Sequence, residues 1–149
     1  MAIARILGES LQAGDVVSLS GDLGAGKTLF CKGIGEALGI DPVRIVSPSF
    51  VLVTEHREGR IPFFHLDAYR LGSVREAEEA GLQEWLEGQG ICAVEWAERI
   101  ESLLPNDRIR VTFHISDERN RKRAIRVETP DVDRFERFRG RVEPFAAGG

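Results

Sequence analysis

The stretch Gly21-Asp22-Leu23-Gly24-Ala25-Gly26-Lys27-Thr28 decides the fold, because it satisfies the pattern G-x-x-x-x-G-K-[S/T]. A β-branched run at 16–20 precedes it, and a helical pattern from 27 to 38 follows it. Glycines let the backbone curl so that successive N–H groups point inward, and the start of a helix adds the positive end of its dipole. Strand, loop and helix in this order predict a loop that holds nucleotide phosphates.

Each position of the loop has an expected role in that chemistry. The backbone of Leu23, Gly24, Ala25 and Gly26 is expected to surround the phosphates, with Lys27 neutralising their charge and Thr28 offering its hydroxyl to Mg²⁺. The alternative is an ordinary glycine-rich turn with a solvated lysine. Because the chain has no N-K-x-D segment of the guanine-specific kind, ATP is the expected nucleotide.

A phosphate loop also requires an acidic group for the metal, at the carboxyl end of a neighbouring apolar strand. Two residues satisfy this condition. Glu95 ends the run Ile91-Cys92-Ala93-Val94-Glu95, and Asp67 ends Phe63-Phe64-His65-Leu66-Asp67. Both are therefore candidate catalytic residues, and the spacing alone does not choose the metal ligand between them.

Composition and charge restrict the class of protein. With 149 residues and 42% hydrophobic side chains, the chain has the size of one globular domain. Its net charge of −4 argues against a dedicated nucleic-acid binder. The chain has neither an apolar run of about 20 residues nor a secretory signal at its start, so we expect no membrane association and a cytoplasmic location. Cys31 and Cys92 lie in apolar segments and are expected to be buried thiols.

Helical and extended patterns alternate around the loop. Helical spacing extends over 2–13, and 73–88 reads as two short helices with Ser73 as N-cap and a break at Gly81. Strands are expected at 50–56, 61–66, 91–96, 108–115 and 123–129, with a hairpin between the first two and an antiparallel pair at a sheet edge formed by the last two. The predicted fold is α/β, a P-loop NTPase with a mixed sheet flanked by helices. We expect a domain over 1–130, followed by a C-terminal helix or frayed tail over 131–149.

Four segments of the chain occur together in a characteristic order and spacing. They are the loop itself, Ser47-Pro48-Ser49-Phe50, His65-Leu66-Asp67-Ala68-Tyr69-Arg70 and Glu95-Trp96. Together they resemble the TsaE family (also called YjeE) of small bacterial ATPases, over about residues 4–127. The joint pattern is far more specific than the phosphate loop alone.

The resemblance implies a role for each matching residue. Thr28 and Glu95 would hold Mg²⁺, and Asp67 would be the second acid, near the γ-phosphate or the attacking water. The family's S-P-T-F segment acts like a switch I loop, so Ser47 and Ser49 are candidates to contact the nucleotide. Ser49 replaces the family's threonine and keeps the hydroxyl.

Several residues near these motifs have two possible roles each. His65 is a candidate to orient Asp67 or a structural histidine, and Trp96 either packs on the core or contacts the nucleotide. The resemblance places Arg123 close to the nucleotide. The basic cluster around it is either a solvated hairpin or a surface for tRNA or protein.

By resemblance, the protein supports formation of N6-threonylcarbamoyladenosine at position 37 of tRNA. Its expected partners are the TsaD and TsaB proteins, with tRNA reached indirectly through their complex. ATP hydrolysis is expected to be slow alone and to reset that complex between cycles. Two other functions fit the loop: a small-molecule phosphotransferase and a nucleotide-dependent binding module.

Overall fold

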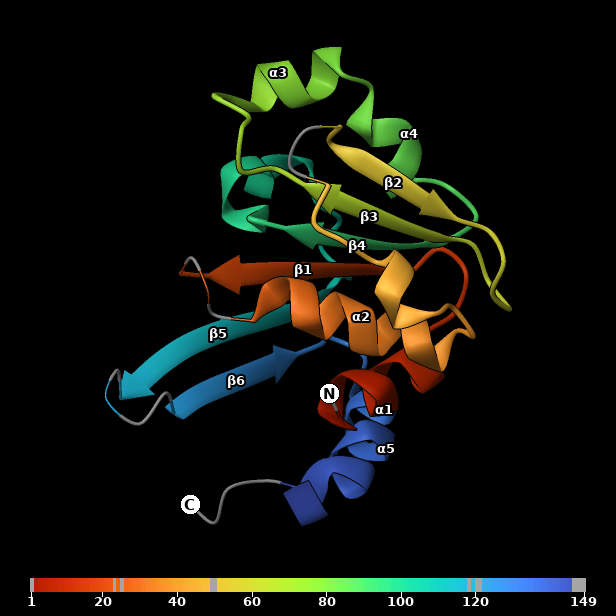
Figure 1. Ribbon diagram of the computed structural model, residues 1–149, viewed down its shortest axis with the longest axis vertical. Coiled ribbons are helices and arrows are strands. Elements are labelled where there is room, and N and C mark those ends of the chain that lie inside the picture. The colour runs from red at the N-terminus through yellow and green to blue at the C-terminus, as the bar shows by residue number, and fades with distance from the viewer. Residues whose placement is uncertain are drawn as a thin grey trace.

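Six strands form one mixed sheet in the computed structural model, which describes residues 2–22, 24, 26–48, 51–117, 119 and 122–145 (Figure 1). The strands lie in the order β2-β3-β4-β1-β5-β6. Their bounds are β1 (Val16–Gly21), β2 (Val53–His56), β3 (Phe63–Asp67), β4 (Ile91–Glu95), β5 (Ile109–Asp117) and β6 (Lys122–Glu128). The expected α/β fold with a mixed sheet flanked by helices is confirmed.

The four central strands are parallel, and both edge strands are antiparallel to their neighbours. β1 pairs in parallel with β4 and with β5, and β4 pairs in parallel with β3. β2 runs antiparallel to β3, and β6 runs antiparallel to β5, as the sequence predicted. The carboxyl ends of β1, β3 and β4 therefore meet at one edge of the sheet, where ligands of open α/β sheets bind.

Helices cover the two faces of the sheet (Figure 1). On one face, α1 (Ala2–Ser10), α2 (Lys27–Ala37) and α5 (Val132–Val142) contribute to a core that includes Val17, Leu19 and Ala93. On the other face, α3 (Val74–Glu79), α4 (Leu82–Leu86) and the 3₁₀ segment η2 (Ala97–Leu103) pack with Leu66 and Val94. Two further 3₁₀ turns are η1 (Pro42–Arg44) and η3 (Glu143–Phe145).

Capping and turn residues explain most helix boundaries. The Ser73 side chain accepts a hydrogen bond from the Glu76 N–H at the start of α3, and Gly81 separates α3 from α4 with a φ of 76°. The first helix ends at Ser10 rather than at 13. The reason is local, because the Asp15 carboxylate accepts the N–H of Gln12 at 2.7 Å and turns the chain towards β1.

The expected strand at 50–56 is shorter in the structure. β2 begins at Val53, because the Pro48 carbonyl accepts the N–H groups of both Val51 and Leu52 and forms a turn there. Phe50, the predicted first residue of this strand, lies outside the described residues. Strand β3 begins at Phe63 and extends through Asp67, one residue further than predicted.

The two cysteines are free and buried on opposite faces of the sheet, as expected. Burial raises the pKa of both thiols, and that of Cys31 is raised further by the charges of Glu95 and Asp67. No helix in the described part of the chain has the length and apolar character needed to cross a bilayer.

The C-terminal helix α5 docks against the start of the chain. Phe138 is 6% exposed and joins the core cluster of α1 and α2, and Arg134 Nη1 lies 3.0 Å from the Asp15 carboxylate. Arg141 pairs with Glu9 of α1. Helix α5 is therefore packed and ion-paired to the body of the molecule.

The close contact between α1 and α2 generates a stability prediction. A Cβ on Gly8 would lie 2.7 Å from Ala37 Cβ and 3.0 Å from the Ile34 carbonyl oxygen. We expect Gly8→Ala to lower the free energy of unfolding by about 1–3 kcal/mol in urea titrations, because the two helices must separate. The control is Gly140→Ala in α5, where a Cβ meets nothing within 4 Å. It should stabilise by about 0.5–1 kcal/mol, and equal effects of the two changes would contradict the packing argument.

Candidate nucleotide site

The phosphate loop connects β1 to α2 at the carboxyl edge of the sheet. Gly24 and Gly26 have φ values of 76° and 103°, a region that favours glycine. Gly26 is the N-cap of α2, and no side chain caps this helix end. Its first N–H groups therefore point to where an anion would lie. Leu23 and Ala25, which sequence reasoning also assigned to phosphate binding, lie outside the described residues.

Lys27 folds back over the loop. Its Nζ donates to the carbonyls of Gly21 at 2.6 Å and Asp22 at 2.9 Å, and lies 3.9 Å from the centre of the Trp96 ring. Burial lowers the pKa of the Lys27 ammonium, while the negative charges of Glu98 and other carboxylates oppose this shift. The lysine charge is therefore held beside the loop, where phosphate oxygens could replace the carbonyl partners.

Thr28 and Glu95 are already in contact. Thr28 Oγ1 donates to Glu95 Oε1 at 2.9 Å, and its distance to Oε2 is 3.1 Å. Glu95 is 3% exposed at the end of β4, while Thr28 lies in the first turn of α2. A hydroxyl and a carboxylate are the kind of oxygen donors that Mg²⁺ prefers, so these two residues fit the metal that a bound nucleotide requires.

Asp67 lies beside Glu95, because the two are register partners at the ends of β3 and β4. Ser47 Oγ donates to Asp67 Oδ2 at 2.8 Å, and the Tyr69 N–H donates to Oδ1 at 2.9 Å. The structure thus brings the second acid to the same edge and connects it to the segment that precedes β2. Ser49 lies outside the described residues.

Arg123 reaches the loop from the edge strand β6. A Cβ built on Gly26 would lie 3.2 Å from Arg123 Nη1, which places the guanidinium directly over the loop. The family resemblance alone predicted that Arg123 lies close to the nucleotide. The antiparallel pairing of β6 with β5 explains how this residue comes close to the loop.

His65 contacts a different acid from the one expected. The sequence offered it as a candidate to orient Asp67, but its Nε2 lies 2.5 Å from Glu95 Oε2. The reason is register: His65 pairs with Ala93 on β4, and the small alanine leaves room for the imidazole to reach the carboxylate two residues further on. Alternation along β3 indicated the face of the sheet but not which acid lies within reach.

An aromatic and cationic group adjoins the lysine. The Tyr69 and Trp96 rings are 4.9 Å apart, and the Arg99 guanidinium lies 5.3 Å from the Tyr69 ring. Trp96 has a φ of 56°, a left-handed conformation that is rare for a bulky residue. It therefore both packs against its neighbours and contacts the loop lysine. Arg99 was missed by sequence reasoning, because a lone arginine in a helical segment has no motif.

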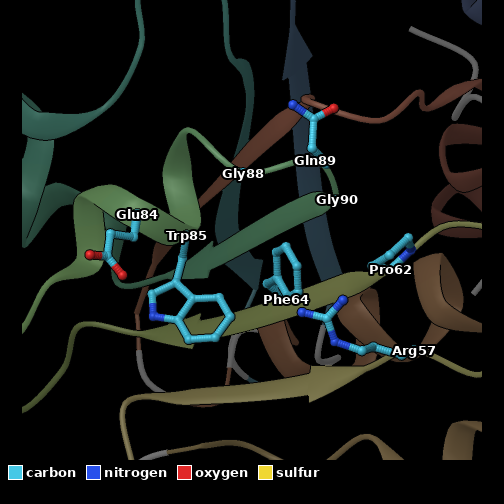
Figure 2. A pocket seen from close by; sticks show the side chains of 8 residues that line it. All are labelled: Arg57, Pro62, Phe64, Glu84, Trp85, Gly88, Gln89 and Gly90. Carbon is cyan, nitrogen blue, oxygen red and sulfur yellow. The ribbon is translucent and has the colours of Figure 1, made fainter.

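A second pocket lies at the opposite end of the parallel strands. Its volume is about 260 Å³, and Figure 2 shows Phe64 between Trp85 and Arg57 at its floor. The Arg57 guanidinium lies 5.5 Å from the Phe64 ring, whose centre is 5.1 Å from that of Trp85. Among the described residues, none of those predicted to bind the nucleotide lines this pocket.

Comparisons with known proteins agree with the motifs and the fold. The family described as "Threonylcarbamoyl adenosine biosynthesis protein TsaE" matches residues 1–125. A curated relative of that name from Bacillus subtilis is 47% identical over 113 residues, which are 75% of this chain and 69% of the relative. One from Nostoc is 45% identical over 124 residues, with 80% of this chain and 75% of the relative covered.

A solved structure extends the similarity to three dimensions. The crystal structure of Bacillus subtilis YdiB superposes with a TM-score of 0.74 at 38% identity, and covers 97% of this chain and 86% of that one. Sequence motifs, fold and relatives thus agree. The chain belongs to the TsaE family of P-loop proteins, which is named for tRNA threonylcarbamoyladenosine biosynthesis.

Proposed function

We propose that this protein is an ATPase that binds Mg·ATP at the carboxyl edge of the sheet and hydrolyses it in complex with TsaD and TsaB during tRNA N6-threonylcarbamoyladenosine formation. The observation that carries the proposal is the 2.9 Å hydrogen bond between Thr28 and the buried Glu95, beside an uncapped helix start and a buried lysine. Oxygen donors, backbone N–H groups and one cation thus converge on a single place. In this proposal residues 1–130 are the ATPase domain and 131–149 are a C-terminal helix or frayed tail, of which α5 packs against α1 and α2.

The residues of the loop divide the work of binding. The backbone of Leu23, Gly24, Ala25 and Gly26 surrounds the phosphates, and Lys27 exchanges its carbonyl partners for phosphate oxygens. Arg123 adds a second positive charge over Gly26, at the position that its guanidinium occupies in the structure.

The two acids perform different tasks. Thr28 and Glu95 hold Mg²⁺, which when bound neutralises the charge that develops on the phosphates. Asp67 accepts a hydrogen bond from the attacking water and thereby orients it. Ser47 and Ser49 report the state of the nucleotide through the segment before β2, since Ser47 is hydrogen-bonded to Asp67 in the structure.

Partner proteins complete the site in this proposal. Three apolar side chains that are close in sequence to proposed site residues are solvent-exposed: Leu29 at 47%, next to Thr28, and Val46 at 56% and Val51 at 64%, on either side of Pro48. Exposed apolar side chains suit contact with a protein that closes over the nucleotide and excludes water. TsaD and TsaB are the proposed partners, tRNA is engaged through their complex, and the location is the cytoplasm where tRNA is modified.

Removal of the loop lysine tests nucleotide binding. We expect Lys27→Ala to weaken Mg·ATP binding at least about tenfold, since a hydrogen bond to a charged group contributes about 1.5–3 kcal/mol. Calorimetric titration measures the affinity. In cells that depend on this gene, the variant should also fail to restore threonylcarbamoyladenosine in tRNA. Lys32→Ala in the same helix, where the amine donates to the Pro42 carbonyl at 3.2 Å, is the control.

Substitution of the two acids separates their roles. Glu95→Gln should raise the Mg²⁺ concentration needed for half-maximal ATP binding by at least about 10–100-fold, because loss of a ligand costs no less than loss of a partner that orients it. Asp67→Asn should leave that concentration nearly unchanged and lower the hydrolysis rate. Titrations of Mg²⁺ at fixed ATP give the first quantity and phosphate release gives the second. The reverse pattern would exchange the two assignments.

The decisive experiment for the whole proposal is phosphate release from Mg·ATP with and without TsaD and TsaB of the same organism. Slow hydrolysis alone and a large increase with both partners are expected. Fast hydrolysis that ignores the partners would contradict the proposal. Slow hydrolysis without any increase would favour a phosphotransferase whose acceptor is absent.

A further inference from the structure

We propose that His65 is a positioning residue for Glu95: its Nε2–H holds one carboxylate oxygen, so that the other is presented to Thr28 and the metal. The inference deepens the proposed function and rests on it, since Glu95 is taken there as a ligand of Mg²⁺. It assigns a task to a histidine that has no role in the proposed function as stated above.

The contact between the two side chains is short and buried. His65 is 0% exposed, Glu95 is 3% exposed, and Nε2 lies 2.5 Å from Oε2. An ionised carboxylate can only accept a hydrogen bond, so Nε2 carries the proton and donates. Within the described residues, His65 Nδ1 is buried without a hydrogen-bond partner. In the described part of the chain, the polar contact of the imidazole is therefore the one that Nε2 makes with Glu95.

The imidazole is held in one orientation by its neighbours. Its ring stacks on Phe63 with the centres 6.2 Å apart and the planes 23° from parallel. The Cys31 Sγ, a ring nitrogen of His65 and a carboxylate oxygen of Glu95 all lie within 4.8 Å of one another, and all three residues are buried. Packing on strand and helix therefore leaves the ring little freedom to turn away from the carboxylate.

The two carboxylate oxygens differ in their nearest partners. Oε2 is 2.5 Å from His65 Nε2 and 3.1 Å from Thr28 Oγ1, while Oε1 is 2.9 Å from Thr28 Oγ1 and is not contacted by the imidazole in any hydrogen bond that the structure records. With Oε2 fixed, the carboxylate cannot rotate about its terminal bond, and Oε1 stays directed at α2. Hydrogen-bonded partners behind a ligand commonly contribute about 10–100-fold to metal affinity.

The burial of His65 has a cost that its hydrogen bond with Glu95 offsets. A fully buried imidazole with one unpartnered nitrogen is destabilising compared with an apolar ring of the same shape. The neighbouring strand provides a direct comparison. His56 stacks on Phe63 at the same 6.2 Å separation, is 6% exposed and contacts neither acid of the site in any interaction that the structure records.

The test compares His65→Phe, His65→Gln and the matched control His56→Phe. The first keeps a stacking ring and removes the donor, the second keeps an N–H donor near the same position, and the third changes a buried histidine away from Glu95. For each full-length variant we would measure ATP affinity in EDTA, the Mg²⁺ concentration for half-maximal ATP binding, and thermal unfolding.

We expect His65→Phe to raise the required Mg²⁺ concentration about 10–100-fold, with ATP affinity in EDTA close to that of the wild type. His65→Gln should restore most of the Mg²⁺ affinity, and His56→Phe should leave it unchanged. A purely structural role would instead change stability and metal-free affinity together.

An unchanged Mg²⁺ requirement in His65→Phe would overturn the inference while leaving the proposed function intact. An equal rise in His56→Phe, or no recovery in His65→Gln, would also overturn it, since the loss would then not depend on the Nε2 donor. Absence of Mg²⁺-dependent ATP binding by the wild-type protein would overturn both the inference and the proposed function.

Discussion

The site depends on the hydrogen bonds of the buried Glu95 carboxylate. Glu95 is the last residue of β4. Its carboxylate accepts a hydrogen bond from the Thr28 hydroxyl of α2 and contacts the His65 imidazole of β3. A buried charged group is tolerated only when it is hydrogen-bonded, so these partners are held to it. The helix start and two strand ends are thereby tied together. Any displacement of α2 along the sheet would break at least one of these contacts.

The two acids of the site lie in register but belong to different parts of the molecule. Glu95 is connected to the phosphate loop through Thr28, whereas Asp67 is connected to the segment before β2 through Ser47. In the proposed function, this division would let Glu95 hold the metal while Asp67 stays connected to the segment around Ser47.

Lys27 illustrates how the loop is arranged before a ligand binds. Its ammonium is buried, donates to two carbonyls of its own loop and lies against the Trp96 ring. Burial lowers its pKa, which means that the charged form is less favourable there than in water. Phosphate oxygens would offer stronger partners than neutral carbonyls, so binding relieves this unfavourable environment. Trp96 connects the same lysine to Tyr69 and Arg99 at the surface.

Much of this could be predicted from the sequence, because the decisive features are local. Gly26, Lys27 and Thr28 are adjacent in sequence. The strand before them (Val16–Gly21) and the helix that follows (Lys27–Ala37) directly flank the loop, so a short stretch of sequence contains the whole motif. The capping of α3 by Ser73 and the break at Gly81 likewise depend on near neighbours. Helix α1 ends at Ser10, earlier than predicted, because the Asp15 carboxylate accepts a hydrogen bond from the Gln12 N–H. Hydrophobic periodicity does not reveal such a side-chain hydrogen bond.

The sequence by itself determined the phosphate loop, the two acids at strand ends and the alternation of elements that defines an α/β fold. The tertiary structure alone decided which acid contacts Thr28, that His65 contacts Glu95 rather than Asp67, and that Arg123 lies over Gly26. The physical reason is strand order and register. Residues 67 positions apart, such as Thr28 and Glu95, become hydrogen-bond partners only when β4 pairs with β1 and α2 begins at their carboxyl ends.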